Sequence, residues 1–340
     1  MKSIDIEYNQ KRSQHRKYGR IQECFYCGKN KKCIQSHSIS QSHCLNQLSE
    51  EINKQKGVYG FDSTTWNWSN WYDGNIIPGE FKLVGTNIAS TFTGFCDNDD
   101  RTIFSLIDNY DFDDNSPEQC FLYCYRAFAR GYHKKREDLK SCESDSKFAN
   151  ENPDYVTRRG YECNIGLTLD MGNFPILMNE WLDNKEFNKL HHFYFRTKVP
   201  LPMASSSFTQ PSFDIMQHRI NDYRIHVPFN HIFLNIIPEE KVTHILISCF
   251  ESQKKSIQFV DSIKDMYNQG NKDKVGTFLT TFLIFFTENT FFKPSLINDL
   301  PYYQKRNLLL SLRNSITDNV QDYFLNNPIN ESLNLFGNTL

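Results

Sequence analysis

The feature that most constrains this chain is a pair of cysteines separated by two residues, Cys24 and Cys27. Two thiols at this spacing can bind one metal ion, and a closed zinc site in a protein needs about four ligands. The same spacing recurs at Cys96 and Asp99, and His37 lies between the two pairs. The sequence therefore predicts a structural zinc ion bound by Cys24, Cys27, Cys96 and Asp99, which would connect two distant segments.

A second arrangement of ligands stays open. Cys33, His43 and Cys44 are close enough to His37 in the sequence to complete an entirely local metal site. In that case His37 would be a zinc ligand, and a third alternative is that His37 is a packed histidine. We interpret the pair at 24–27 as metal-binding rather than redox-active, because no helix pattern follows it.

Length and composition predict a folded chain that is long enough for two domains. The 340 residues are 39% hydrophobic and 14% aromatic, which is ample material for packed cores. The first residues do not resemble a signal peptide, and the nearly apolar run 275–286 is too short to span a bilayer. We therefore expect a cytoplasmic protein without a membrane partner, in which cysteines bind metal more often than they form disulfides.

Positive charge is concentrated near the N-terminus, although the formal net charge of the chain is −2. Residues 1–35 contain nine Lys and Arg but three Asp and Glu. A basic segment beside a metal site can bind a phosphate backbone, so Arg12, Arg16, Lys17 and Arg20 are candidate nucleic-acid-binding residues. A solvated terminal arm would explain the same pattern.

Hydrophobic periodicity predicts an α+β fold. Strands are expected at 34–40, 191–199, 231–237 and 242–250, the last two forming a hairpin, and helices at 97–107, 116–139, 255–268, 272–286 and 300–316. Residues 200–211, which are rich in Pro and Ser, are expected to form a loop. Residues 45–80 read as a long loop, whose Trp66, Trp68 and Trp71 would either pack against the protein or stack on unpaired bases.

The helix expected at 116–139 is amphipathic. Its start is typical, because the Ser116 hydroxyl can cap it and Pro117 suits the first helical position. Aromatic residues gather on one face, and the far end of the helix is basic. The basic residues on the other faces are Arg126, Arg130, Lys134, Lys135 and Arg136. The simplest interpretation of this basic end is a solvated surface.

The sequence suggests three parts. Residues 1–110 would form a zinc-containing module, residues 111–150 a linking amphipathic helix, and residues 151–340 a mixed α+β domain. The boundary is placed in the polar stretch 141–160, where an Asn-Pro step at 152–153 interrupts the pattern.

The motifs resemble those of the HNH, or His-Me finger, family of ββα-metal endonucleases. The usual family pattern is a Cys pair, an Asp-His dipeptide, and a second Cys pair followed at once by His. Here Ser36-His37 stands where Asp-His is expected, Cys96 and Asp99 stand at the second pair, and Asp100 stands at the closing position for a metal ligand. A bacterial variant, with Cys and His as the second pair and then Asp, is also similar.

The resemblance covers about residues 20–107 and implies an N-terminal ββα-metal module. His37 would then be the catalytic general base, and Asp100 would hold a catalytic Mg²⁺ or Mn²⁺ ion. The substrate would be DNA, with RNA as a weaker option. The C-terminal domain would serve sensing, binding of a protein partner or self-association, and a role in bacterial phage defence follows by analogy alone.

The same residues allow a second class of protein. Ser36 replaces a carboxylate of the family pattern, and Asp99 replaces a thiolate or imidazole ligand. Both replacements favour a zinc-finger protein without catalytic activity, which would bind nucleic acid or a protein partner.

Overall fold

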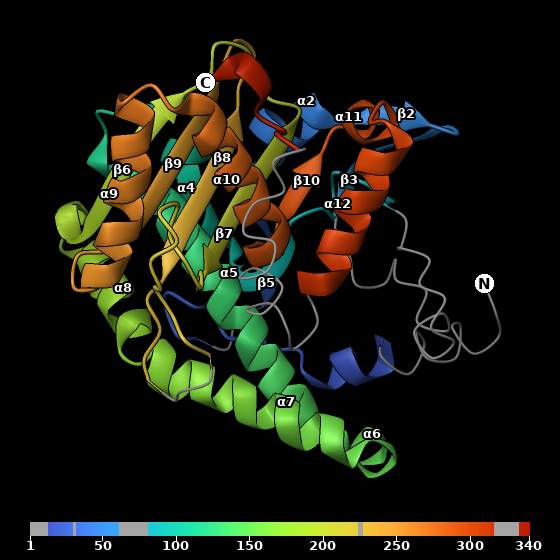
Figure 1. Ribbon diagram of the computed structural model, residues 1–340. Helices are drawn as coiled ribbons and strands as arrows, with labels where there is room; N and C mark the ends of the chain where they lie inside the picture. The colour runs from blue at the N-terminus through green and yellow to red at the C-terminus, as the bar shows by residue number, and fades with distance from the viewer. Residues whose placement is uncertain (1–12, 30–31, 61–80, 224–226, 316–332) are drawn as a thin grey trace.

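The computed structural model describes residues 13–29, 32–60, 81–223, 227–315 and 333–340. Its centre is a long antiparallel sheet with helices on both faces, so the expected α+β class is confirmed (Figure 1). Among the described residues, no helix has the length and apolar composition needed to cross a membrane.

The large sheet has eight strands and combines both ends of the chain. Along the sheet the strands are β2 (Glu50–Ile52), β3 (Gln55–Gly60), β10 (Thr290–Phe292), β7 (Met203–Thr209), β8 (Ile232–Pro238), β9 (Thr243–Phe250) and β6 (Leu190–Arg196), while β4 (Lys82–Val84) pairs with β3. The expected hairpin is confirmed by β8 and β9, in which Pro238 lies opposite Thr243. The division at residues 110 and 150 stays a prediction, and strands from both sides of it share this sheet.

One face of the sheet is covered by α9 (Lys254–Asn268), α10 (Lys272–Phe286) and α12 (Tyr302–Ser315), with the short α11 (Pro294–Asn298) beside them (Figure 1). The three longer helices confirm the predicted ones. The apolar run of α10 lies in the core, where Phe278 and Phe282 contact Phe259 of α9. Its apolar character therefore reflects burial between the sheet and the neighbouring helices.

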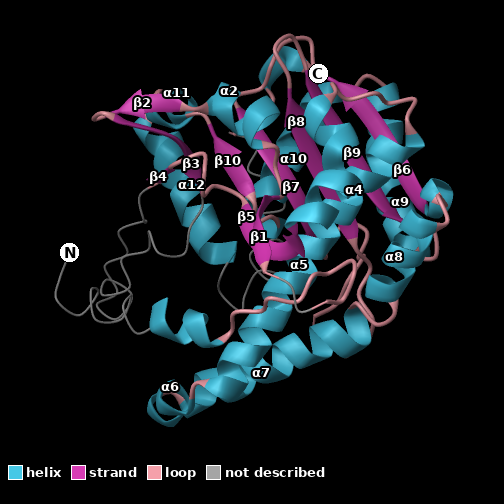
Figure 2. Ribbon diagram, turned by 180° about the vertical axis from the view of Figure 1, so that it is seen from behind, coloured by secondary structure: helices cyan, strands magenta, loops and turns pink. Residues whose placement is uncertain are grey.

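The other face carries α4 (Asp97–Asn109), α5 (Pro117–Ser144) and a two-stranded sheet of β1 (Cys33–His37) and β5 (Thr91–Cys96) (Figure 2). The expected cap of α5 is present, because the Ser116 side chain accepts a hydrogen bond from the Gln119 N–H at 3.2 Å. After β1 the chain forms the short helices η1 (Gln41–Leu45) and α2 (Asn46–Leu48).

The polar stretch expected as a boundary is mostly helical. After α5 come α6 (Ser146–Glu151), α7 (Pro153–Ile165), η3 (Gly166–Asp170), α8 (Phe174–Asp183) and η4 (Phe187–Lys189), and η5 (Gly337–Thr339) ends the chain. The expected break is real but local, because α6 ends at Glu151 and Pro153 begins α7. Helices α6 and α7 pack on the far end of α5 (Figure 1).

Two loop predictions need correction. The loop expected at 200–211 was wrong, because residues 203–209 form β7 in the middle of the sheet. Its serines are buried and their hydroxyl groups have partners: Ser205 and Ser207 lie 3.1 Å apart between hydroxyl oxygens, and the Ser206 hydroxyl lies 2.9 Å from that of Ser38. The long loop expected at 45–80 instead contains β2 and β3, while Trp66, Trp68 and Trp71 lie outside the described residues.

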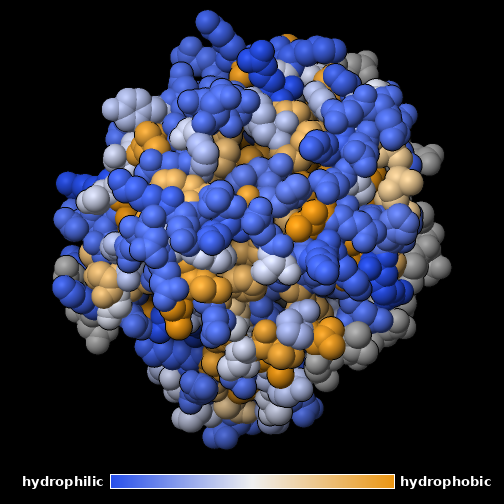
Figure 3. All heavy atoms as spheres, turned by 90° about the vertical axis from the view of Figure 1, so that its left-hand side faces the viewer, coloured by the Kyte–Doolittle hydropathy of each residue, from blue (hydrophilic) through white to orange (hydrophobic). Residues whose placement is uncertain are grey.

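The side of the molecule that carries α8, α9 and the edge strand β6 is mainly hydrophilic (Figure 3). Hydrophobic side chains appear there in small separate groups, and Ile176 of α8 is 62% exposed. Scattered apolar residues of this kind are ordinary on a protein surface. We assign no function to this face.

Candidate metal centre

The metal ligands predicted from the sequence come from a turn and from the junction of a strand with a helix. Cys24 and Cys27 lie in a tight turn, where the Gly28 N–H donates to the Cys24 carbonyl at 3.0 Å. Gly28 has φ of +63°, a conformation that glycine adopts without strain. The Phe25 N–H donates to the Gly94 carbonyl at 2.7 Å and so fixes the turn beside β5.

The second pair is positioned by secondary structure. Strand β5 ends at Cys96, which is the N-cap residue of α4, and Asp99 lies in the first turn of that helix. Because β1 and β5 pair in antiparallel register, with Cys33 opposite Cys96, the end of β5 faces the segment that precedes β1. Two cysteine-containing segments far apart in the sequence are thereby brought together.

The four predicted ligands converge. One sulfur or oxygen atom each from Cys24, Cys27, Cys96 and Asp99 lies within 4.8 Å of all the others. In a tetrahedral zinc site with Zn–S distances of about 2.3 Å, neighbouring sulfurs are about 3.8 Å apart, so a small contraction would suffice. Three of these residues are buried and Cys27 is half-buried. The donor set therefore fits one structural zinc ion.

The electrostatics of the cluster also fit a cation. Burial raises the pKa of the Cys24 thiol to about 12, and its Sγ lies 3.1 Å from Asp99 Oδ2. Burial alone would raise the pKa of Asp99, but hydrogen bonds from the thiols of Cys27, Cys24 and Cys96 lower it to about 2. Buried thiols are neutral without a cation, and a bound zinc ion stabilises their thiolate form.

Supporting contacts from α8 and α5 were not foreseen from the sequence. Tyr26 donates from its hydroxyl to Asp183 at 2.6 Å, and the Asn179 amide donates to the Phe25 carbonyl at 3.1 Å. The Tyr125 hydroxyl in turn donates to Asn179 at 2.7 Å. These hydrogen bonds fix the turn that carries Cys24 and Cys27 against α8 and α5. No sequence pattern links residues 25–26 to residues 179–183.

His37 is the last residue of β1 and is half-buried. Its Nδ1 lies 3.0 Å from the Ala89 carbonyl oxygen, so Nδ1 carries the proton and Nε2 is free to accept one. Burial lowers the pKa of the imidazole below its ordinary value, which favours the neutral form. His37 is separate from the four-ligand cluster, and Cys33, His43 and Cys44 join no metal-binding group among the described residues.

Asp100 follows Asp99 on α4 and lies near His37. Its Oδ1 atom is buried and has no hydrogen-bond partner among the described residues, and the same holds for Ser36 Oγ. Burial raises the pKa of the Asp100 carboxyl, whereas the charge of Arg126, the nearby Ser36 hydroxyl and the charge of His37 act in the opposite direction. The structure therefore places the predicted base and the predicted metal-ligating carboxylate in one polar cluster.

Arg126 belongs to the same cluster, which the sequence did not indicate. The sequence suggests a solvated position for Arg126, which is wrong, because Arg126 is 2% exposed and lies over the Phe104 ring at 3.9 Å. Its guanidinium makes two hydrogen bonds to Asp108 of α4, at 2.8 and 2.5 Å. The positive charge contributes to the lowered pKa of His37, after burial and against the Ala89 hydrogen bond.

The candidate phosphate-binding arm is partly described. Residues 13–18 are helical, and the side chains of Arg16, Lys17 and Arg20 are exposed. Arg12 lies outside the described residues.

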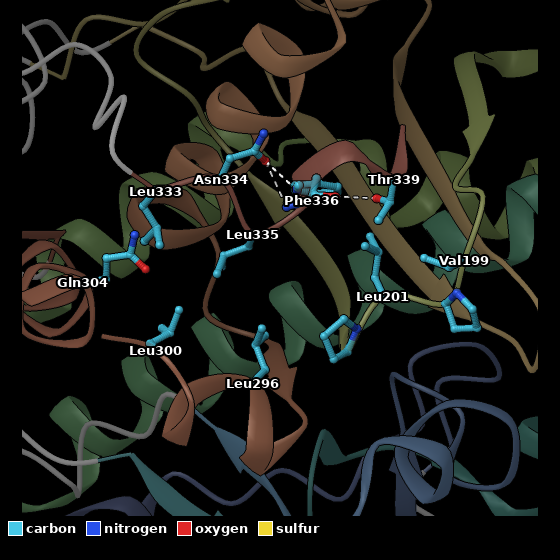
Figure 4. Close-up of a pocket in the computed structure, with 13 residues that line it drawn as sticks. Val199, Leu201, Leu296, Leu300, Gln304, Leu333, Asn334, Leu335, Phe336 and Thr339 are labelled. Atoms are coloured by element: carbon cyan, nitrogen blue, oxygen red, sulfur yellow. Dashed lines mark hydrogen bonds between the residues drawn. The ribbon is translucent and has the colours of Figure 1, made fainter. Parts of the chain in front are cut away.

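A separate cavity of about 350 Å³ lies between the β6–β7 connection, the α11–α12 region and the C-terminal segment (Figure 4). Leu201, Leu300 and Leu335 line it, with Asn334 and Thr339 among its few polar residues. Those two side chains bond to the nearby backbone, as the dashed lines in Figure 4 show. None of the candidate site residues lines this cavity.

Comparisons with protein-family models, with curated proteins and with solved structures find no match to this chain.

Proposed function

We propose that this chain is a metal-dependent endonuclease of the ββα-metal type, which hydrolyses phosphodiester bonds of DNA. The observation that carries the proposal is the placement of His37 and Asp100. His37 is the last residue of β1 in a two-stranded antiparallel sheet, and Asp100 lies in the first turn of α4, the helix that follows β5. The four-ligand cluster includes Cys96 at the end of β5 and Asp99 of α4. This order of strand, strand and helix is the arrangement that the resemblance implies.

His37 has the properties of a general base. The Ala89 carbonyl fixes the ring and its tautomer, so that Nε2 can take a proton from an attacking water. The lowered pKa keeps the imidazole neutral at physiological pH. Asp100 would hold a divalent cation, which when bound stabilises the negative charge of the phosphate and of the leaving oxygen. A structural zinc ion would be bound by the cluster of Cys24, Cys27, Cys96 and Asp99.

A zinc-finger protein without catalysis is the second candidate. It is favoured by Ser36, which is 1% exposed and offers a hydroxyl where a carboxylate would help to hold a divalent cation. In that case the basic arm would still bind nucleic acid or a protein partner. With the nuclease function we also propose a cytoplasmic role in phage defence. The C-terminal half would then bind a protein partner or mediate self-association.

The test is cleavage of supercoiled plasmid in Mg²⁺ or Mn²⁺ by the full chain and by His37→Ala. Loss of the base should reduce the rate by about 10²–10⁴-fold, while the zinc content stays unchanged. His43→Ala is the matched control, because His43 is also a half-buried histidine but lies outside the cluster.

Two results would contradict the proposal. If His37→Ala loses zinc as readily as Cys24→Ser does, His37 belongs to the structural site and the zinc-finger function is favoured. If the full chain and His37→Ala are equally inactive on DNA and on RNA, the enzymatic function fails.

A further inference from the structure

One face of α5 carries a row of charged residues at intervals of four. The row is Arg126, Arg130, Lys134 and Asp138, and each step advances about 6 Å along the helix. It begins beside the candidate catalytic cluster, where the charge of Arg126 acts on His37 and Asp100. The row then continues toward the end of α5 on which the N-terminal helical turn packs (Figure 1).

Among the described residues, those at the two ends of this row form ion pairs, whereas the two in the middle do not. Arg126 pairs with Asp108, and Asp138 pairs with Arg159. Arg130 and Lys134 form no ion pair with a carboxylate in the described parts of the chain, and Arg130 Nε is buried without a hydrogen-bond partner. Two adjacent cations therefore have no ion-pair partner among the described residues.

Their surroundings make both positive charges unfavourable. Burial lowers the pKa of Arg130 to about 10, and the neighbouring Arg130 charge lowers the pKa of Lys134 to about 8. The carboxylate of Glu288, in the connection before β10, attracts both cations, but it lies beyond ion-pair distance. The charge of Arg16 also lowers the pKa of Lys134, whereas the Asp138 carboxylate, one helical turn away, raises it. Such a site gains stability when an anion binds.

The N-terminal arm packs on α5, and this contact fixes the position of Arg16 relative to that helix. His15 is buried and its Nδ1 lies 3.3 Å from Asp145, while Lys140 donates to the Arg20 carbonyl at 2.8 Å. A third contact is an ion pair at 2.6 Å between Arg136 and Glu23. The basic residues of the arm and of α5 therefore form one surface instead of two independent ones.

We propose that Arg130 and Lys134, with Arg16 beside them, form a subsite for a phosphate group of the nucleic-acid backbone. The identity of the anion rests on the proposed nuclease function. The subsite lies one to two helical turns from Arg126, beside the candidate catalytic cluster. A phosphate bound there would be near the phosphate that is cleaved at His37, and it would guide the nucleic-acid strand toward this catalytic residue. This replaces the interpretation of the middle of α5 as merely a solvated surface.

The experiment measures binding without cleavage. In the His37→Ala background, a labelled DNA duplex is titrated by fluorescence anisotropy over a range of salt concentrations. Each lost phosphate contact should lower the slope of log K against log salt by about 0.9. Lys134→Gln and Arg130→Gln should each show this loss, while Lys134→Arg keeps the charge and should retain the slope. Because Lys134 is exposed, its variants should fold even if Arg130→Gln does not.

The matched control is Lys264→Gln, an exposed lysine of α9 on the opposite face of the sheet. If Lys134→Gln has the same affinity and salt slope as Lys264→Gln, the subsite does not exist. If the plasmid assay shows no cleavage but the slope still falls, the subsite stands and the nuclease function fails. The same loss of slope on RNA but no binding to duplex DNA would support the subsite and overturn the choice of DNA.

Discussion

Acid should destabilise this protein through one buried histidine. His231, just before β8, is 0% exposed and stacks on the Phe208 ring at a centroid distance of 4.6 Å. The Gln253 side chain accepts from the His231 backbone N–H at 2.7 Å, which directs its amide nitrogen to His231 Nδ1 at 3.0 Å. Nδ1 is therefore an acceptor and the imidazole is neutral. Protonation of Nδ1 would direct its new N–H at the Gln253 amide group, which is itself a donor. It would also place a positive charge among buried aromatic rings.

The size of the effect follows from the shift of the pKa. Burial, together with the nearby Lys135 charge, lowers the pKa of His231 to about 3. In the unfolded chain a histidine titrates near 6.5. Between these values the unfolded state binds a proton that the native state does not, so stability falls as the pH drops below about 6.5. At pH 5 the loss amounts to about 2 kcal/mol relative to pH 8.

The assay is urea unfolding at pH 8 and at pH 5 of the full chain and of His231→Gln. The variant lacks the titrating group, so its loss of stability over this interval should be smaller by about 2 kcal/mol. His43→Gln, at a half-buried histidine outside this group of aromatic rings, controls for the loss of a histidine as such. Equal pH dependence in the full chain and in His231→Gln would refute the reasoning.

Three further perturbations test the metal cluster, the core and a helix cap. Cys24→Ser should abolish zinc binding, measured by elemental analysis, and lower Tm, because a structural zinc site contributes folding free energy; full zinc content would exclude Cys24 as a ligand. Phe95→Ala removes a fully buried ring that contacts Phe104, so urea unfolding should show a loss of about 3–5 kcal/mol, and a loss below about 1 kcal/mol would disprove tight packing there. Ser116→Ala removes the cap on the Gln119 N–H and should cost about 1 kcal/mol, whereas an unchanged Tm would show that the cap is dispensable.

Local signals account for the elements that the sequence predicted well. The boundaries of α9 and α10 were found to within a residue or so, because an apolar stripe with helical spacing and clear end signals does not depend on distant partners. The β8–β9 hairpin was recognised for the same reason. In contrast, β7 was missed, because its serines look like a loop until neighbouring strands satisfy their hydroxyl groups. One such partner is Thr290 of β10, which bonds to Ser205 at 2.9 Å.

The sequence by itself determined the chemistry available at the candidate metal centre. Cys-x-x-Cys at 24–27 and Cys-x-x-Asp at 96–99 are short-range patterns, and each fixes two donors on one turn of chain. Tertiary structure decided the charges around that centre. Arg126, Arg130 and Lys134 look alike in the sequence, yet one is paired with Asp108 and two are not. The physical reason is that an ion pair forms only where packing brings a carboxylate within a few ångströms, and that depends on how α4, the N-terminal arm and the β10 connection meet α5.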